Sequence, residues 1–328
     1  NTMKFVLFCI LFVYAFADPK AWEAFKAKYQ KVYAQDEEEN RYNIFLENLA
    51  KVEELNKGGN PVFGVTKFMD LDQTEFKKSY LMDVDFEAKK EAVLSEVEPI
   101  EVNIEALPTS YDWKSKNVVT PVKNQGQCGS CWDFSATETM ESVCALAGYP
   151  LTKFSEQQIV DCDHDGVYGC NGGFPWDAYK YIIQVGGIES EADYPYTARD
   201  GTCKFDKSKV QPCQVTSWQW VSQAAGDESK MQQFCYENSP LSICVDAAQW
   251  QYYNGGVLMA SQCGHQIDHC VQITGWKVMS GTKVWTVRNS WGENWGEQGY
   301  IYLEFGQNTC SLAMDVTVPC ATKDGKKA

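Results

Sequence analysis

Polar and apolar positions follow a helical period early in the chain. Six residues that lie three or four positions apart share one face of a long helix. They are Glu37, Arg41, Phe45, Asn48, Val52 and Asn56. Gly58-Gly59-Asn60-Pro61 follows and ends the helix. An ordinary amphipathic helix has the same spacing, so the pattern by itself predicts a structure and no function.

The pattern becomes mixed after residue 106. Helical periodicity predicts three helices, over residues 131–147, 155–161 and 174–185. Short β-rich runs further along predict strands. Their ranges are 241–245, 271–274, 284–287, 300–303 and 314–318. Helices followed by antiparallel strands predict an α+β chain built as two lobes.

Composition divides the chain at the same point. All but one of the 14 cysteines lie after residue 106, as do all 3 histidines. We therefore predict a helical unit over residues 18–106 and a second unit over residues 107–328. The second unit should contain a helical lobe over about 117–215, a β lobe over about 216–315 and a mobile polar tail, residues 321–328.

The first residues have the pattern of an export signal. Lys4 precedes an apolar run from Phe5 to Phe16, and small residues two apart, Ala15 and Ala17, come just before Asp18. This pattern predicts a signal peptide over residues 1–17. The run is shorter than the about 20 residues of a membrane-spanning helix, and no later segment is apolar enough. We expect a soluble protein of the secretory pathway, extracellular or lysosomal and endosomal, in which disulfides form readily.

The charge balance excludes one class of partner. The chain has 29 Lys and Arg residues against 44 Asp and Glu residues, a net charge of −15. Nucleic-acid binding requires clustered basic side chains that neutralise phosphates. We therefore expect no nucleic-acid partner.

One short string has the residue types of nucleophilic catalysis. It is Gln125-Gly126-Gln127-Cys128-Gly129-Ser130-Cys131-Trp132, and Asp268-His269 and Asn289-Ser290-Trp291-Gly292 follow it downstream. Cysteine, histidine and asparagine in this order and at about this spacing resemble the papain family of cysteine proteases. The helical face at 37–56 and the string Gly64-Val65-Thr66-Lys67-Phe68-Met69-Asp70 resemble the propeptide of cathepsin L-like zymogens.

The chemistry of these residue types can be stated independently. Cys131 begins a predicted helix, whose positive end favours a thiolate, and a neighbouring imidazolium of His269 would favour it further. Asn289 would orient that imidazole by accepting its other N–H. The Gln125 amide and the Cys131 backbone N–H would face the oxyanion that develops during acyl transfer. Trp291 would shield the contact between His269 and Asn289 from water.

The resemblance implies a two-lobed papain-like fold, with a helical lobe and an antiparallel, barrel-like β lobe, preceded by a helical propeptide domain. It implies a cysteine endopeptidase made as a zymogen, whose mature chain begins near Leu107 to Thr109. No extra His-bearing loop that would close one end of the groove is evident, which favours an endopeptidase over an exopeptidase. The expected partners are peptide and protein substrates, the protein's own propeptide as an intramolecular inhibitor, and cystatin-like inhibitors. We expect a monomer that needs no cofactor and no metal.

The resemblance also implies a substrate groove between the lobes. Gly172 and Gly173 would hydrogen-bond an extended peptide. The full set of implied substrate-binding residues is Gly172, Gly173, Phe174, Pro175, Cys244, Ile267, Asp268, Cys270, Trp291 and Asp315. Asp315 would lie on the floor of the pocket for the second residue before the scissile bond. Two interpretations of Asp315 stay open: it accepts Arg or Lys there, or it is a solvated strand-end aspartate.

Cysteine pairings follow from the same resemblance. The implied pairs are Cys128–Cys170, Cys162–Cys203 and Cys263–Cys310, with Cys131 free as the nucleophile. A fourth bridge, Cys213–Cys320, is predicted because these two residues flank strands that should run side by side. Cys144, Cys235, Cys244 and Cys270 are predicted to be buried thiols, the commoner role of an unpaired interior cysteine.

Three alternative hypotheses remain weaker. The string from Asp161 to Gly166 resembles the start of an EF-hand, but its twelfth position is Gly172 instead of the required Glu. Cys128-x-x-Cys131 is also found in redox motifs and half of zinc sites. Neither explains Gln125, Asn289 and Trp291, and His164 and His265 are expected to be solvent-facing loop residues.

The third alternative is a catalytically silent homologue that acts as a binding protein or inhibitor. Asp133 favours it, because most relatives have Ala two residues after the nucleophile, and a negative charge there would raise the Cys131 pKa. The propeptide also departs from the commonest pattern at Thr66 and Val52. Asp70 and the Glu37–Glu39 run are candidates for groups whose protonation loosens the propeptide in acid.

Overall fold

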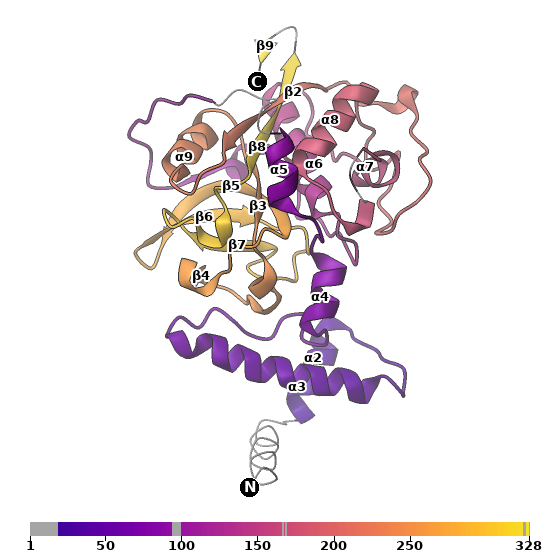
Figure 1. The fold of residues 1–328 in the computed structure, drawn as a ribbon, viewed down its shortest axis with the longest axis vertical. Coiled ribbons are helices and arrows are strands. Elements are labelled where there is room, and N and C mark those ends of the chain that lie inside the picture. The colour runs from indigo at the N-terminus through magenta and orange to yellow at the C-terminus, as the bar shows by residue number, and fades with distance from the viewer. Residues whose placement is uncertain (1–18, 94–99, 166, 168, 324–325, 328) are drawn as a thin grey trace.

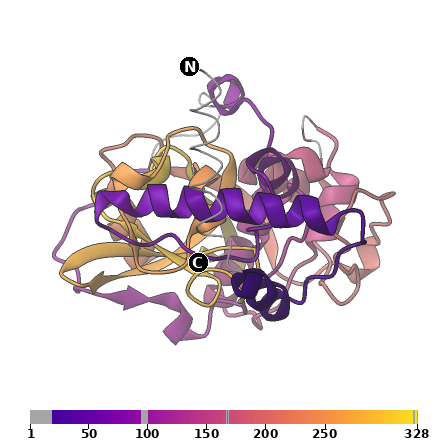
Figure 2. The same ribbon diagram turned by 90° about the horizontal axis from the view of Figure 1, so that it is seen from below.

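The computed structural model describes residues 19–93, 100–165, 167, 169–323 and 326–327, so the predicted signal peptide lies outside the described residues (Figure 1). Three parts are visible: an N-terminal helical unit (residues 19–93), a helical lobe and a β lobe. In Figure 1 the first helices of the N-terminal unit lie beneath the two lobes, and its last helix stands between them. Figure 2 shows the longest helix crossing the underside of both lobes.

Aromatic packing organises the N-terminal unit. Its helices are α2 Pro19–Tyr29, α3 Glu38–Leu55, α4 Gln73–Tyr80 and α5 Phe86–Val93. Trp22 and Phe25 of α2 pack on the fully buried Phe45 of α3, with ring centroids 5.3 and 5.0 Å away. The long helix predicted over 37–56 is confirmed, and it ends as predicted where Gly59 adopts φ +85°.

The polar members of the predicted α3 face bind the chain that follows. Asn48 donates from Nδ2 to the carbonyl oxygens of Met69 and Leu71, at 2.9 and 2.8 Å. Its Oδ1 accepts a 2.9 Å hydrogen bond from the Tyr252 hydroxyl of the β lobe. Arg41 Nη1 donates to the Asp70 carbonyl oxygen. The polar side chains on this face of α3 therefore bind residues 69–71 and attach the N-terminal unit to the β lobe.

The helical lobe contains the predicted helices. They are α6 Cys131–Leu146, α7 Glu156–Cys162 and α8 Pro175–Val185. Every residue of α6 from Cys131 to Cys144 is buried, including Glu138 and Glu141. Glu141 pairs with Lys123, and Glu138 lies 3.2 Å from Arg288 Nε. These pairs allow a helix with acidic residues to pass through the centre of the molecule, because a buried charge requires a partner.

One sheet forms the β lobe in the described residues. Its main strands are β2 Gln214–Ser222, β3 Leu241–Val245, β4 Val257–Leu258, β5 His269–Met279, β6 Thr282–Arg288, β7 Tyr300–Glu304 and β8 Val316–Lys323. The strand order is β2-β8-β3-β5-β6-β7-β4, and only β4 and β7 pair in parallel. Two-residue strands β1 Tyr111–Asp112 and β9 Lys326–Lys327 join β5 and β8, and helix α9 Glu228–Glu237 follows β2.

The α+β, two-lobed prediction is confirmed, with two corrections. The described sheet is open rather than barrel-like, since β2 and β4 stand at opposite ends of the strand order. The mobile tail predicted from residue 321 is wrong for residues 321–323, because β8 continues through Lys323. Ala321 is fully buried opposite Val215 of β2, so the two chain segments bury each other.

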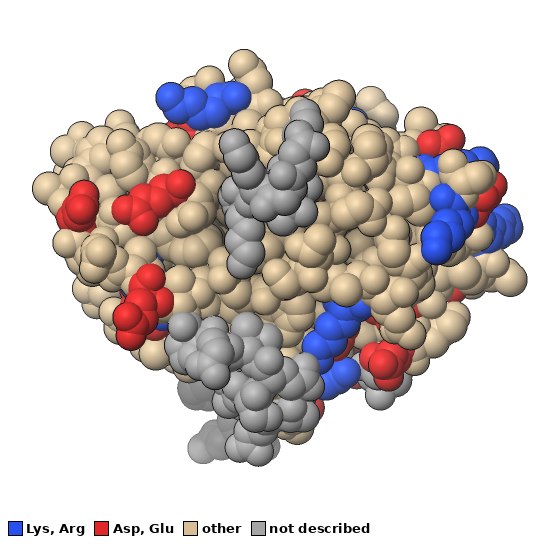
Figure 3. Space-filling model, turned by 90° about the horizontal axis from the view of Figure 1, so that it is seen from above, with Lys and Arg blue, Asp and Glu red and all other residues tan. Residues whose placement is uncertain are grey.

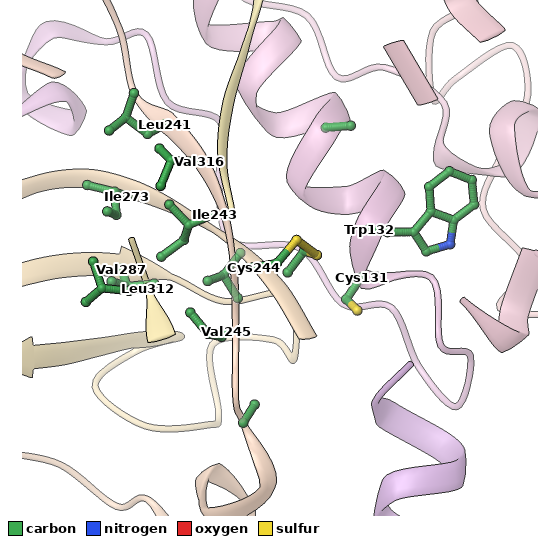
Figure 4. Packing of buried hydrophobic residues seen from close by; sticks show 14 of the residues in the cluster. Cys131, Trp132, Leu241, Ile243, Cys244, Val245, Ile273, Val287, Leu312 and Val316 are labelled. Atoms are coloured by element: carbon green, nitrogen blue, oxygen red, sulfur yellow. A yellow bond between two sulfur atoms is a disulfide. The ribbon is translucent and has the colours of Figure 1, made fainter. Parts of the chain in front are cut away.

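The core lies between α6 and the central strands (Figure 4). Ile243, Ile273 and Val316 from three adjacent strands are fully buried there. Ser135 of α6 crosses this contact with two hydrogen bonds of 2.7 Å, one to Ser242 Oγ and one to the Val271 carbonyl oxygen. The start of α6 is therefore fixed against β3 and β5.

Five disulfides join the described cysteines. Cys128–Cys170, Cys162–Cys203 and Cys263–Cys310 have formed as the resemblance implies. The other two are Cys144–Cys213 and Cys244–Cys270, so the prediction of buried thiols is wrong for Cys144, Cys244 and Cys270. Among the described residues Cys131, Cys235 and Cys320 are free.

The predicted Cys213–Cys320 bridge is wrong, and strand register gives the reason. Cys320 lies opposite Ser217 in the β2–β8 ladder, whereas Cys213 precedes the first residue of β2. Four residues of extended chain, about 13 Å, separate Cys213 from the position opposite Cys320. Cys213 instead meets Cys144, near the end of α6.

Charged side chains are dispersed over one face of the molecule. On the face seen in Figure 3, blue Lys and Arg side chains and red Asp and Glu side chains lie in separate small groups. None of the helices in the described part of the chain is both long and apolar enough to cross a bilayer.

Candidate active site

Cys131 is the first residue of α6 and is free and fully buried. The loop before it is fixed by the Cys128–Cys170 disulfide and by a 2.7 Å hydrogen bond from Gly129 N–H to the Cys170 carbonyl oxygen. A Cβ at Gly129 would lie 2.6 Å from that oxygen, so the close approach requires glycine. The thiol therefore sits at the positive end of a helix whose position is set by a covalent bridge.

His269 and Asn289 meet across neighbouring strands. His269 begins β5, and Asn289 follows the last residue of β6. His269 Nε2 lies 2.8 Å from Asn289 Oδ1. Because that oxygen is an acceptor, the bond places the ring proton on Nε2 and leaves a lone pair on Nδ1. Nδ1 is buried and makes no hydrogen bond to any described residue.

An indole covers this pair as predicted. Trp291 is fully buried, and its ring centroid lies 4.7 Å from that of His269. Trp250 contacts the imidazole edge-on at 5.9 Å. The His269–Asn289 hydrogen bond therefore lies in an apolar environment, where water does not compete for it.

Burial holds the thiol and the imidazole neutral. It raises the pKa of Cys131, although the backbone N–H groups of Cys270 and Trp132 favour the thiolate. It also lowers the pKa of His269 to about 4, against the opposing effect of the Asn289 hydrogen bond. The Asp268 charge and the Cys270 N–H, on either side of His269, both act on the Cys131 thiol. The segment that contains His269 therefore borders the nucleophile.

Gln125 lies in the loop that leads to Cys131, and its side chain is fully buried. Its Nε2 donates to the Cys128 carbonyl oxygen at 2.8 Å and to the Tyr80 carbonyl oxygen at 3.1 Å. Its Oε1 accepts a 2.7 Å hydrogen bond from Ser290 Oγ, which fixes the amide orientation. An amide donor is thus directed at a carbonyl group of the N-terminal unit.

The N-terminal unit continues along the same surface as an extended chain. Met82 N–H donates to the Asp268 carbonyl oxygen at 2.7 Å, and Asp83 N–H donates to the Asn171 carbonyl oxygen at 3.2 Å. A Cβ on Gly172 would lie 2.8 Å from Val84 Cγ1, so glycine admits the passing chain. On Gly173 a Cβ would lie 2.7 Å from the Trp132 ring. Residues 80–84 therefore occupy the groove in which substrate was expected.

The expected pocket residues are all buried. They are Phe174, Pro175, Cys244, Ile267, Cys270 and Asp315. The ring of Phe86 of α5 packs against that of Phe174 at a tilt, with centroids 5.8 Å apart. The interpretation of Asp315 as a solvated strand-end residue is wrong, because it is fully buried and neither carboxylate oxygen has a hydrogen-bond partner among the described residues.

Sequence reasoning missed the residue that faces Asp315. Lys90 of α5 donates from Nζ to the Met314 carbonyl oxygen at 3.0 Å. Burial raises the pKa of Asp315 well above its usual range, and the Lys90 charge is the main opposing influence. Lys90 sits on a short helix with no recognisable motif, so no signal in the sequence assigned it to the pocket.

Sequence reasoning also missed how the N-terminal unit covers Trp291. Phe68 and Phe76 meet the indole edge-on, with centroids 5.3 and 5.4 Å away, and Tyr80 lies 6.3 Å away. Lys67 Nζ donates to the Trp291 carbonyl oxygen at 2.5 Å, and burial lowers the Lys67 pKa to about 8. The i,i+4 spacing of Phe76 and Tyr80 was the available signal.

Asp133 is buried, which the sequence did not reveal. Both of its carboxylate oxygens lack a hydrogen-bond partner within the described residues, and its side chain is fully enclosed. Burial raises its pKa well above the usual range, and the Glu156 charge adds to the effect while Lys123 opposes it. Burial therefore favours the protonated, uncharged form of Asp133.

Cysteines required by the two metal-binding hypotheses are already bonded in disulfides. Cys162 of the EF-hand-like string is in a disulfide, and so is Cys128 of the Cys128-x-x-Cys131 motif. Across the part of the chain that the structure describes, no three His, Cys, Asp or Glu side chains form a metal-binding group. His164 and His265 are exposed, as predicted.

Comparisons with known proteins identify both parts of the chain. Residues 107–320 match the family model described as papain family cysteine protease, and residues 22–76 match the cathepsin propeptide inhibitor domain. Cysteine proteinase 1 of Dictyostelium discoideum is 39% identical over 314 residues, which cover 88% of this chain and 89% of that protein. The chain belongs to the papain family of cysteine proteases.

Solved structures of papain-family zymogens share the whole architecture. Digestive procathepsin L2 proteinase from the larval midgut of Tenebrio molitor superimposes with a TM-score of 0.81 at 33% identity, covering 92% of this chain and 99% of that one. A recombinant stem bromelain precursor gives 0.78 at 33% identity, covering 94% and 100%. The predicted papain-like fold with an N-terminal propeptide is therefore confirmed, and we call residues 19–93 the propeptide from here on.

Proposed function

We propose that this papain-family protease is a cysteine endopeptidase made as a secretory zymogen, with Cys131 as nucleophile and His269 as its base. One observation supports this assignment above the others. A free cysteine at the start of a buried helix lies beside the Asp268–Cys270 segment, and His269 of that segment is bound through Nε2 to an asparagine oxygen at 2.8 Å. This is the arrangement that activated thiol nucleophiles require.

The proposed reaction uses these residues in sequence. With the propeptide removed, water and substrate reach the site, and the proton moves from the Cys131 thiol to His269 Nδ1. The thiolate attacks the carbonyl carbon of the peptide bond, while Gln125 Nε2 and the Cys131 N–H bind the oxyanion. His269 then protonates the leaving amine, and water attacks the acyl-enzyme to release the second product.

The contacts of the propeptide support intramolecular inhibition. Tyr80 presents its carbonyl oxygen to Gln125 Nε2, the donor proposed to bind the oxyanion. Met82 uses the Asp268 carbonyl oxygen, which would otherwise be available to an extended substrate. The propeptide therefore takes substrate hydrogen bonds while keeping Cys131 buried. We propose residues 18–106 as the removable segment and a mature N-terminus near Leu107 to Thr109.

The burial of Asp315 supports acceptance of Arg or Lys at the second position before the scissile bond. In the zymogen a basic side chain from the propeptide, Lys90, already lies where its charge acts on this carboxyl group. Apolar neighbours such as Phe174 and Ile267 would accept bulky apolar residues at the same place. We propose extracellular or endolysosomal peptides and proteins as substrates, consistent with five disulfides that persist in oxidising compartments.

Covalent labelling tests the proposal directly. The activated protein, treated with an epoxide inhibitor of cysteine proteases, should be labelled at Cys131 and lose peptide hydrolysis in proportion. Cys131→Ala should remove both labelling and hydrolysis, and His269→Ala should slow both by at least about a hundredfold. Labelling that is absent, or that falls on Cys235 or Cys320 instead, contradicts the assignment.

The same experiment decides the alternative of a silent homologue. Asp133, two residues after Cys131, favours this alternative, because its charge raises the Cys131 pKa. A correctly folded, propeptide-free protein that binds peptides but neither hydrolyses them nor reacts with the epoxide would support it. If Asp133→Ala alone restores hydrolysis, Asp133 is the cause of the missing activity.

A further inference from the structure

The Cys244–Cys270 disulfide joins two strands at the edge of the candidate active site. Cys244 of β3 lies directly opposite Cys270 of β5 in the ladder, and the next pair is Val245 opposite His269. Cys270 therefore follows the proposed base in the chain and shares its strand. Both cysteines are fully buried in the zymogen.

The disulfide lies next to the end of the β3–β5 ladder. His269 is the first residue of β5, and β3 ends at Val245 opposite it, so the two strands terminate together. Strand ends open more easily than strand centres, because fewer neighbouring hydrogen bonds hold them. A covalent link at the penultimate pair restrains the end of the ladder that presents the imidazole.

The same bridge reaches the nucleophile. The Cys270 backbone N–H acts on the Cys131 thiol and favours its thiolate. On the other side of the bridge, Ser135 of α6 is bound to Ser242 of β3 and to the Val271 carbonyl oxygen of β5. Figure 4 shows the disulfide at Cys244 on the side of the strand that faces Cys131.

It also reaches the proposed specificity residue. The Cys244 backbone N–H donates a 3.0 Å hydrogen bond to the Asp315 carbonyl oxygen, just before β8. The disulfide thus links the backbone that holds the pocket carboxyl group to the backbone that holds the proposed base. Cys244 and Cys270 are buried, as are Phe174 and Ile267 of the proposed pocket.

We propose that the Cys244–Cys270 disulfide is a redox-sensitive positioning element of the active site. When intact it holds His269 against Cys131 and keeps Asp315 in register, and its reduction lowers turnover. A dithiol reductant breaks the S–S bond by thiolate attack on one sulfur. Two electrons and two protons pass to Cys244 and Cys270, which become thiols, and the reductant becomes a disulfide. The inference rests on the proposed function of Cys131 and His269.

The first test replaces the bridge without opening a hole. The test uses enzyme activated from the full-length chain that carries Cys244→Val and Cys270→Ala. Both new side chains are apolar, and valine keeps a β-branched residue in the strand. We expect kcat to fall by about tenfold or more, because a misplaced base costs rate, with KM changed less than about twofold. The acid limb of the pH profile of Cys131 alkylation should also shift, since formation of the thiolate depends on the imidazole position.

The matched control removes a disulfide at the other end of α6. Cys144 lies 13 residues after Cys131 along this helix, about 20 Å away. Cys144→Ala with Cys213→Ala should leave kcat and the pH profile of Cys131 alkylation unchanged. Equal losses of kcat and equal pH shifts in both double variants would mean general destabilisation and would overturn the positioning role.

The second test uses the unaltered enzyme in thiol and disulfide buffers of increasing reducing strength. Activity should first rise as Cys131 that was oxidised during handling returns to the thiol, and then fall as the bridge opens. Alkylation and peptide mass spectrometry should locate new thiols at Cys244 and Cys270. The Cys244→Val, Cys270→Ala enzyme should show only the rise. A bridge that resists reduction, or one that opens with kcat unchanged, overturns the inference while Cys131 labelling keeps the proposed function intact. Failure of every enzyme form to hydrolyse peptides or label at Cys131 overturns both.

Discussion

Two fully buried carboxyl groups, Asp133 and Asp315, differ in what surrounds them. The acidic side chain of Glu156 acts on Asp133 together with Lys123, in the interior of the helical lobe. Asp315 lies in the proposed pocket, where burial raises its pKa and the charge of Lys90, which would leave with the propeptide, opposes this effect. One carboxyl group is therefore part of the permanent interior, and the other would be uncovered when the zymogen is activated.

Asp315 should decide the preference for basic residues in the mature enzyme. Removal of the propeptide takes away Lys90, so the vacated pocket presents an unpaired carboxyl group whose pKa burial has raised. Preference for Arg over Leu at the second position should rise as pH rises and this group ionises. Asp315→Asn should abolish the rise, as measured by kcat/KM on matched peptides between pH 4 and 7.

One result would contradict the role proposed for Asp315. An Arg to Leu ratio that is independent of pH, or that rises equally in Asp315→Asn, would show that the carboxyl group does not contact the substrate. Asp227→Asn serves as the control, since this carboxyl group is partly exposed and pairs with Lys230 at the start of α9.

Asp133 should make folding stability fall as pH rises. Its folded-state pKa lies well above the usual value, so the native protein binds a proton that the unfolded chain has already released. Between those two pKa values, stability falls by about 1.4 kcal/mol per pH unit for this one group. In Asp133→Asn, which cannot ionise, that slope is absent.

Urea unfolding of the zymogen measures this effect. The difference in unfolding free energy between Asp133→Asn and the unaltered chain should widen with pH from 5 to 7. A constant difference would show that the carboxyl group ionises at an ordinary pKa and is solvated. Asp85→Asn is a suitable control, because this carboxyl group is exposed before α5.

At the scale of elements, α4 links the propeptide to the proposed base through one indole. The capping box of Asp72 and Glu75 begins α4 and sets the direction of the helix. Phe76 is fully buried and meets Trp291, which in turn lies 4.7 Å from His269. The helix thereby packs on the residue that shields the His269–Asn289 hydrogen bond.

Phe76→Ala should weaken inhibition in the zymogen. Loss of a fully buried phenylalanine costs about 3–5 kcal/mol, part of which comes from docking of the propeptide. The zymogen should then react with an epoxide inhibitor at Cys131 at least about tenfold faster at pH 7, where the unaltered zymogen is protected. Lys78→Ala, on the exposed face of α4, is the matched control.

Equal labelling rates for the Phe76→Ala and Lys78→Ala zymogens would contradict this role of α4. Circular dichroism of each variant shows whether the helices of the propeptide remain formed. A Phe76→Ala zymogen with helices intact and Cys131 still protected would place the inhibitory contact elsewhere, for example at residues 80–84.

At the scale of the whole molecule, ion pairs stabilise the propeptide fold that blocks the groove. Lys31 Nζ lies 2.7 Å from Asp70 Oδ2, which also accepts a 2.9 Å hydrogen bond from the Tyr33 hydroxyl. Lys26 pairs with Glu38, and the hydrogen bond from Lys26 holds the Glu38 pKa below its usual value. A lowered carboxyl pKa means stabilisation that is present near neutral pH and lost as pH falls through the folded value.

The zymogen should therefore activate at pH 4 and stay intact at pH 7. Asp70→Asn, which cannot form the ion pair with Lys31, should shift the activation midpoint to higher pH. The release of residues 18–106, followed on gels over time at several pH values, measures this midpoint. Asp36→Asn, at an exposed position before α3, should leave it unchanged.

Equal activation of the unaltered zymogen at pH 4 and pH 7 would contradict acid release altogether. An unchanged midpoint in Asp70→Asn would exclude this ion pair as the trigger and leave the Glu37–Glu39 run as the remaining candidate. Arg41 Nε already contacts Glu37 Oε1 at 2.8 Å, so that run also lies in an ion-pair network.

Local order and the family resemblance were available from the sequence by itself. The long helix α3, the order of the cysteine, histidine and asparagine motifs, and three disulfides followed from periodicity, spacing and similarity. These properties depend on neighbours within a few residues or on strings that relatives share, so one chain is enough to recognise them.

Tertiary structure decided which distant residues meet. The register of the β2–β8 ladder keeps Cys213 away from Cys320, and Cys213 forms its disulfide with Cys144 instead. Cys244 and Cys270 lie directly opposite each other and form a disulfide next to His269. Burial of Asp133 and the approach of Lys90 to Asp315 depend on how α5, α6 and β8 pack. No spacing along the chain encodes these contacts, because burial and register are properties of surfaces brought together by the fold.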